Sequence, residues 1–235
     1  MSSDQPIGTA LPGWTPRQAP PPTVMQGRFC RLEPLSAASH AQDLFAANQL
    51  DAQGRNWTYL FVGPFVDFAS YRAWVEQVES SADPMFFSII DEATGKAVGV
   101  ATFMRMDRAN GVIEVGNINF SPLLQRKPAA TEAMFLMMQR AFDELGYRRY
   151  EWKCDSLNAP SRAAALRLGF QYEGLFRQAV IYKGRNRDTT WFSIIDRDWP
   201  KLKQAYSRWL SPANFGKDGA QIKSLRACID DMLAT

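Results

Sequence analysis

The chain has 235 residues, of which 46% are hydrophobic and 22% are charged. This composition excludes a disordered protein, and the length favours one large domain with extensions over two independent domains. A formal net charge of +3 is too small to indicate a nucleic-acid partner, and we expect none.

The sequence gives little support for a membrane-spanning segment or for a metal site. No apolar run approaches the roughly 18 residues of a membrane span, and residues 1–4 lack the features of a secretory signal, so we expect a cytoplasmic protein without a membrane contact. The cysteines Cys30, Cys154 and Cys228 lie far apart, and His40 is the one histidine. This pattern argues against a disulfide framework, a metal site and a Ser-His-Asp triad.

The N-terminal third predicts an arm, a strand and two helices. Residues 1–23 are rich in proline and predict an extended arm outside the core. A short strand follows over residues 29–35. Apolar residues at helical spacing predict one helix capped by Ser36 and a second over residues 67–80. An aromatic-rich segment, 56–65, lies between the two helices.

The rest of the chain predicts a sheet with helices packed over it. Short turns at Thr94-Gly95 and Asn110-Gly111 indicate an antiparallel meander of three strands. A helix, a strand, a second helix and a hairpin follow, and this order predicts a mixed α/β fold. The predicted elements cover residues 85–90, 97–105, 112–120, 130–145, 149–154, 161–168, 172–183 and 189–196. A helical tail then packs either on the core or on a second subunit.

A strand, a loop and a helix meet at residues 118–133, and this join can hold an anion. Small residues at the helix start let a phosphate approach backbone N–H groups that have no partner in the helix, and Arg126 and Lys127 add positive charge. An ordinary helix start after a proline explains the same residues. Donor N–H groups are expected at Arg126, Lys127, Ala129, Ala130 and Thr131.

Several motifs in this region carry a resemblance to a known family. Gln125-Arg126-Lys127-Pro128-Ala129-Ala130 resembles the acyl-coenzyme A signature Gln/Arg-x-x-Gly-x-Gly/Ala of the GNAT superfamily of N-acetyltransferases. Four further segments resemble the branch that includes the ribosomal-protein alanine N-acetyltransferases: Arg31 to Leu35, Thr131 to Ala133, Asn158 to Ser161 and Leu168 to Phe170. Pro128 replaces the first glycine of the signature, which removes one N–H donor.

The resemblance covers residues 24–200 and implies a fold. It implies a mixed, mostly antiparallel sheet with helices on both faces, the GNAT-like acyl-CoA N-acyltransferase fold. The chain then divides into a Pro-rich arm (1–23), an acetyltransferase domain (24–200) and a C-terminal helical extension (201–235). A homodimer that uses the extension fits this division.

The resemblance also implies an activity. We expect an acetyl-CoA-dependent N-acetyltransferase that transfers the acetyl group by direct attack of a primary amine, either a peptide N-terminus or a small-molecule amine, with no metal. Two alternatives stay open: a catalytically silent acyl-CoA-binding module, and an RNA- or ribosome-associated factor. The latter would use two basic clusters, Arg148, Arg149 and Lys153, and Lys183, Arg185 and Arg187.

By resemblance, the backbone of the strand before the loop holds the pantetheine arm, and the loop and helix start hold the phosphates. The expected cofactor-binding residues are Ile118, Asn119, Phe120, Gln125, Arg126, Lys127, Ala129, Ala130, Thr131 and Asn158. Ser161 matches a serine that lies near the cofactor sulfur, so it is the candidate general acid. Helix capping is the alternative role for Asn158 and Ser161.

The candidate base and the acceptor pocket rest on weaker patterns. Strand alternation places Glu114 on the face of Gly116, Ile118 and Phe120, where it can accept a proton through water if that face borders the active site. An exposed carboxylate is the alternative. The expected walls of the acceptor pocket, which suit a hydrophobic core equally well, are Trp57, Tyr59, Phe61 and Phe65.

Overall fold

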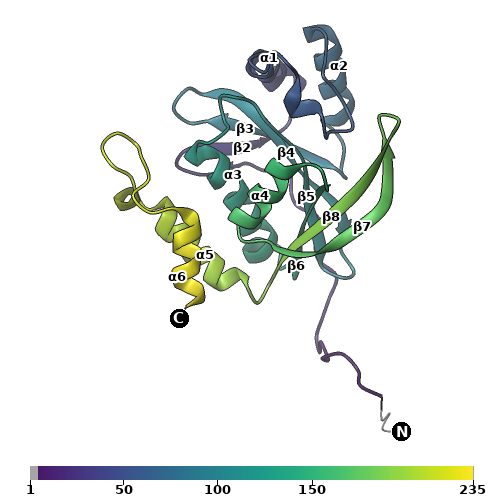
Figure 1. Ribbon diagram of the computed structural model, residues 1–235, viewed down its shortest axis with the longest axis vertical. Helices are drawn as coiled ribbons and strands as arrows, with labels where there is room; N and C mark the ends of the chain where they lie inside the picture. Colours follow the sequence, from purple (N-terminus) through teal and green to yellow (C-terminus); the bar gives the residue numbers. More distant parts are fainter. Residues whose placement is uncertain (1–4, 235) are drawn as a thin grey trace.

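The computed structural model describes residues 5–234 and is built around an eight-stranded sheet (Figure 1). The residues on which the secretory-signal argument rests, 1–4, lie outside the described part. Neighbouring strands are antiparallel except β5 and β6, which are parallel. The strand order is β1-β2-β3-β4-β5-β6-β8-β7. The strands are β1 (Met25–Gln26), β2 (Cys30–Pro34), β3 (Met85–Asp91), β4 (Lys96–Asp107), β5 (Val112–Phe120), β6 (Arg149–Asp155), β7 (Gln171–Tyr182) and β8 (Arg185–Ile195).

Six α-helices lie within the described residues, and none is both long and apolar enough to cross a membrane. They are α1 (Ala37–Gln49), α2 (Phe68–Val78), α3 (Pro128–Gln139), α4 (Ala159–Arg167), α5 (Trp199–Leu210) and α6 (Leu225–Leu233). Ser36 caps α1 as predicted, because its side chain accepts a hydrogen bond from the N–H of Ser39. The predicted helix over 130–145 is shorter: α3 ends at Gln139, and a π-helical turn over Arg140–Glu144 follows.

Two hydrophobic clusters lie on opposite faces of the sheet. Helices α1 and α2 pack over Ile90 and Val100 on one face, whereas α3 packs over Phe87 and Phe103 on the other. The apolar residues of α5 and α6 join the α3 cluster. The predicted mixed fold with helices on both faces is confirmed, and the tail packs on the core, which was one of its two expected positions.

The described part of the N-terminal arm, residues 5–23, is fastened to the body of the protein. The indole N–H of Trp14 donates to the carbonyl of Ala109 at 2.8 Å, beside the turn between β4 and β5. Further along the arm, the buried Arg140 donates to the carbonyls of Thr23 and Val24 at 2.7 and 3.1 Å. These contacts hold the arm without adding it to the sheet.

Strand alternation fails in β5, where Asn117 forms a β-bulge. Gly116 pairs with Thr102 and Asn119 pairs with Val100, so β5 carries one residue more than β4 between these pairs. The backbone of Asn117 adopts a positive φ of 47°. After the bulge, Ile118 and Phe120 pack against the α3 cluster, the face of Ile113 and Val115 and not that of Glu114. The predicted shared face for Glu114, Ile118 and Phe120 is therefore wrong.

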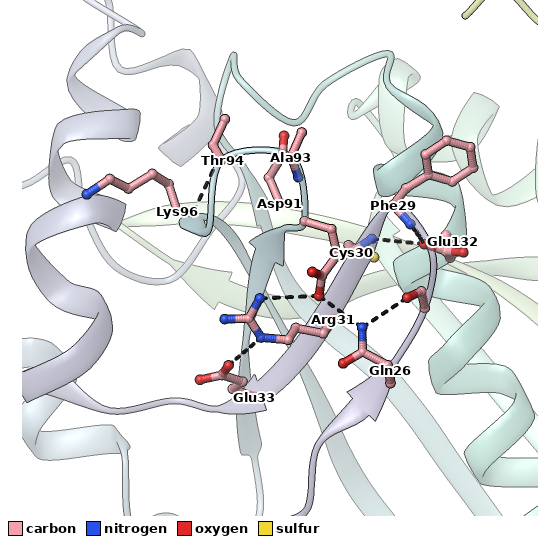
Figure 2. Close-up of polar contacts among 12 residues, drawn as sticks. Gln26, Phe29, Cys30, Arg31, Glu33, Asp91, Ala93, Thr94, Lys96 and Glu132 are labelled. Atoms are coloured by element: carbon pink, nitrogen blue, oxygen red, sulfur yellow. Dashed lines mark hydrogen bonds and ion pairs between the residues drawn. The ribbon is translucent and has the colours of Figure 1, made fainter.

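A buried carboxylate fastens α3 to the edge of the sheet (Figure 2). Glu132 accepts hydrogen bonds from the backbone N–H groups of Arg28, Phe29 and Cys30 at 2.9, 2.6 and 2.9 Å. A Cβ atom at Gly27 would lie 2.6 Å from the Glu132 carboxyl carbon, so only glycine leaves room for this approach. Glu132 thus fixes the first turns of α3 against the start of β2.

Glu132→Ala is expected to lower the free energy of unfolding by about 3 kcal/mol, because it leaves buried N–H groups without an acceptor. Urea denaturation measures this loss. Glu76→Ala is the control, since Glu76 forms an exposed ion pair with Arg72 that contributes less than about 1 kcal/mol. Equal losses in the two variants would contradict the role given to Glu132.

Candidate active site

The parallel ladder between β5 and β6 ends in the middle of the sheet. It pairs Val112–Val115 with Arg149–Trp152, while β5 continues to Phe120 and β6 to Asp155. The bulge at Asn117 lies just beyond the last pair and redirects β5. Backbone N–H and C=O groups on the side of β5 that faces β6 are therefore left for another partner.

The start of α3 follows β5 after the loop 121–127 and is the expected anion-binding surface. Gln125, Arg126 and Lys127 are exposed, whereas Ala129 and Ala130 are buried. The N–H of Lys127 donates to Leu124 O at 3.3 Å and that of Ala130 to Lys127 O at 3.1 Å. The amides of Arg126 and Ala129 donate to no backbone carbonyl in the described chain. Fewer donors are available than the sequence indicated.

Arg167 is a cation at this surface that the sequence did not reveal. Its guanidinium, on α4, donates to the Thr131 hydroxyl on the first turn of α3 at 3.1 Å. The two residues are 36 positions apart, and no local pattern links them. The N-terminus of α3 thus has a positive side chain from a second helix beside it, which reinforces its preference for anions.

Gln125 is engaged within the chain at the end of β5. Its side-chain amide donates to the Phe120 carbonyl at 2.8 Å and to the Asn56 side chain at 2.9 Å. Asn56 in turn donates to the Phe120 carbonyl at 3.2 Å. These bonds tie the aromatic-rich segment, which overlaps the 3₁₀ turn Arg55–Trp57, to the end of β5.

Asn158 and Ser161 lie at the start of α4. The Asn158 side chain accepts a hydrogen bond from the N–H of Ser161 at 3.1 Å and so caps the helix. The Ser161 hydroxyl oxygen accepts a bond from the Trp152 indole at 3.0 Å, and Trp152 is the last β6 residue of the parallel ladder. Because the oxygen is the acceptor here, the Ser161 hydroxyl still has a hydrogen to donate.

Glu114 lies on the other face, and it is buried with only 3% of its surface exposed. The expected alternative of an exposed carboxylate is therefore wrong. One of its oxygens lies 2.8 Å from Lys153 Nζ, and both lie 3.1 Å from Arg105 Nη1. Lys153 also contacts Glu151 at 2.7 Å and lies 3.8 Å from the centre of the Trp191 ring. Glu114 is held as part of a charged network.

The four aromatic residues expected to line the acceptor pocket divide into two pairs. Trp57 and Phe65 have ring centres 5.3 Å apart and belong to the α1–α2 cluster. With Tyr71 they line a cavity of about 210 Å³ beside the end of α1. Tyr59 and Phe61 instead face the end of β6 and the β7–β8 hairpin: the Tyr59 hydroxyl donates to Leu157 O at 3.1 Å, and the Phe61 ring centre lies 5.5 Å from that of Tyr182.

The tip of the β7–β8 hairpin reaches towards α2 and fastens onto the aromatic-rich segment (Figure 1). Lys183 Nζ donates to the carbonyls of Trp57, Val62 and Gly63 at 2.8, 3.3 and 3.0 Å. Burial lowers the pKa of Lys183. We call these three bonds the hairpin latch, and no sequence pattern indicated them.

Tyr182 gives the hairpin a second attachment, at the end of β6. Its hydroxyl donates to an Asp155 side-chain oxygen at 2.8 Å. Burial, and then this hydrogen bond, raises the pKa of Tyr182 to about 12.

Within residues 5–234, no three His, Cys, Asp or Glu side chains lie together as metal ligands do.

Comparison with known proteins agrees with this arrangement. A family model described as an acetyltransferase (GNAT) domain matches residues 30–171. The uncharacterized N-acetyltransferase p20 of Bacillus licheniformis is 30% identical over 144 residues, which cover 60% of this chain and 80% of that protein. A second relative is YdaF of Bacillus subtilis, which is named a putative ribosomal N-acetyltransferase. It is 28% identical over 105 residues, which cover 45% of this chain and 57% of YdaF.

A solved structure is similar over nearly the whole chain. The crystal structure of a GCN5-related N-acetyltransferase from Brucella melitensis superposes with a TM-score of 0.92 at 51% identity, covering 94% of this chain and 100% of that one. The family match spans more than half of the chain, and it includes the parted strands and the start of α3. The chain is an acetyltransferase of the GNAT family, as its motifs predicted.

Proposed function

We propose that the protein transfers an acetyl group from acetyl-CoA to a primary amine by direct attack. The observation that carries the proposal is the early end of the β5–β6 ladder beside the N-terminus of α3. Acetyl-CoA supplies the activated acetyl thioester. The acceptor is either a peptide N-terminus or a small-molecule amine.

The residues around the parted strands fit such a ligand. The backbone of Ile118, Asn119 and Phe120 lies beyond the last β5–β6 pair and can bond the amides of a pantetheine arm, except for the Phe120 carbonyl, which already accepts two side-chain bonds. The N–H groups of Arg126 and Ala129 can bind the diphosphate, together with the positive side chains of Arg126, Lys127 and Arg167. Pro128 lacks an N–H but occupies the first helical position, where that donor has no partner within the helix.

Proton transfer is assigned to Glu114 and Ser161. An aliphatic ammonium must lose a proton before its nitrogen can attack, and we propose that Glu114 accepts this proton through water. Glu114 pairs with Glu151 one position before the ladder ends, and its carboxylate is held by Lys153. The Ser161 hydroxyl gives a proton to the departing sulfur as the N–C bond forms and the C–S bond breaks.

The observed contacts disfavour a polyanion-binding role for the first basic cluster. Arg149 is paired with Glu151 and Glu173, and Lys153 is paired with Glu114 and Glu151. These two charges are neutralised within the protein, which leaves Arg148 as the exposed cation of the cluster. The homodimer, the cytoplasmic location and the absence of a nucleic-acid partner stay predictions.

Acetyl-CoA is expected to raise the melting temperature, because a ligand at 100 times its dissociation constant adds about 2.7 kcal/mol of stability if only the folded state binds it. Differential scanning fluorimetry measures the shift. Arg167→Ala should reduce the shift, whereas Arg162→Ala, an exposed arginine on the same helix, should preserve it. No shift in the unaltered protein at millimolar acetyl-CoA overturns the proposed function.

Ser161→Ala is expected to lower kcat by about 100-fold, because a general acid contributes at least that much, and to change acetyl-CoA affinity less than twofold. Steady-state kinetics and calorimetry measure the two quantities. Ser224→Ala removes the α6 cap and serves as the control, with a stability loss of about 1 kcal/mol and an unchanged kcat. If kcat and affinity fall together in Ser161→Ala, its role is structural.

Lys183→Met is expected to release the hairpin latch, since three backbone carbonyls lose their donor. Amide hydrogen exchange should accelerate in residues 57–63 and 180–187, and KM for the amine should rise more than kcat changes. Arg185→Met is the matched control on the same exposed tip. Unchanged exchange in Lys183→Met would show that the latch does not hold the segment.

A further inference from the structure

Arg187 is a buried cation that the proposed reaction does not use. Only 8% of its surface is exposed. Its Nε donates to the Thr189 hydroxyl at 3.1 Å, yet no carboxylate of the described residues lies within ion-pair distance of its guanidinium. A buried charge without an ionic partner is costly, and folded proteins rarely keep one without a use.

Side chains from two separate segments flank the Arg187 guanidinium. Its central carbon lies 5.7 Å from the centre of the Phe61 ring and 5.8 Å from that of the Tyr182 ring. Asp155 is the nearby acid at the end of β6, but its two side-chain oxygens accept hydrogen bonds from the Tyr182 hydroxyl and the Leu157 N–H. Among the described residues, no hydrogen-bond acceptor is found for the terminal nitrogens of Arg187, so they keep their hydrogen-bonding capacity for another group.

Arg187 shares a face of β8 with the network that holds Glu114. Every second residue of a strand points to the same face, so residues 187, 189 and 191 lie on one face of β8. The Trp191 ring on that face contacts Lys153, which pairs with Glu114. At about 3.3 Å per residue, Arg187 lies roughly 13 Å along the strand from Trp191. An extended molecule can thus place an amine near Glu114 and another group near Arg187.

The charge of that group follows from the cations available. A guanidinium bonds a carboxylate through two parallel N–H donors, and one positive charge matches one carboxylate. Lys183, a second cation at this end of the hairpin, donates to three carbonyls in the latch and has no further donor, and Arg185 is exposed at the tip. A doubly charged phosphate would meet only one buried cation here, since Arg185 lies in solvent.

We propose that Arg187 binds a carboxylate of the acceptor, so that the enzyme acts on amines that carry a carboxylate several bonds away from the reacting nitrogen. This inference rests on the proposed acetyl transfer and names its substrate class. Arg187 is then a specificity-determining residue, and the preference it creates lies in acceptor binding.

The test compares ω-amino acids of increasing chain length with their carboxamides, using thiol release from acetyl-CoA. At the best chain length, the unaltered enzyme should prefer the acid over the amide at least tenfold in kcat/KM, mainly through KM. Arg187→Gln should bring this ratio near one, and Arg187→Lys should keep part of it. Arg185→Gln, which removes an exposed charge from the same strand, should leave the ratio unchanged.

Three results would overturn the proposal. They are an acid-to-amide ratio near one at every length in the unaltered enzyme, an Arg187→Gln variant that slows acids and amides equally, and a tenfold preference for ω-aminophosphonates over the acids. Calorimetry with N-acetyl-6-aminohexanoate and its amide gives a readout without turnover, in which tighter binding of the acid should disappear in Arg187→Gln. Absence of thiol release with every amine would refute the acetyl transfer, while this binding difference would still decide the role of Arg187.

Discussion

The early end of the β5–β6 ladder is the constraint on which the site depends. The two strands share pairs only from Val112 to Val115, and each is followed by a helix that begins beside the gap. The N-terminus of α3 therefore brings unpaired amides to one strand, and that of α4 brings Ser161 to the other. Had the ladder continued, the backbone of Ile118 to Phe120 would be bonded within the sheet and unavailable to a ligand.

The bulge at Asn117 separates two chemical environments at this gap. It keeps Ile118 and Phe120 on the α3 side, where the α3 cluster and the bonded pair of Trp152 and Ser161 lie, and it leaves Glu114 on the opposite side. The proposed proton acceptor, Glu114, and the proposed proton donor, Ser161, thus lie on different faces of the sheet. The Glu132 bonds to the start of β2 hold α3 in place while the strands beside it diverge.

The sequence predicted the features that depend on neighbours along the chain. Ser36 and the turn at Gly111 have local signals, and the motif order identified the family. The bulge was missed because the prediction assumed that side chains alternate along a regular strand. An asparagine with a positive φ does not change the spacing of apolar residues in the sequence, so nothing marked the bulge. Lys183 and Arg167 were missed because their contacts join residues that are 126 and 36 positions apart. When residues far apart in the chain form a site together, the sequence indicates that site only through its resemblance to a known family.

Two buried arginines, Arg140 and Arg187, differ in how many bonds the chain makes to their guanidinium groups. Arg140, 4% exposed, donates to the carbonyls of Thr23 and Val24 and pairs with Glu144, so the chain itself bonds all three of its guanidinium nitrogens. Arg187 is almost as buried but bonds only the Thr189 hydroxyl. The same protein neutralises one buried guanidinium and bonds each of its nitrogens, while it bonds one nitrogen of the other and leaves its charge unpaired. The unpaired one borders the proposed acceptor site, where a bound anion would supply the missing partner.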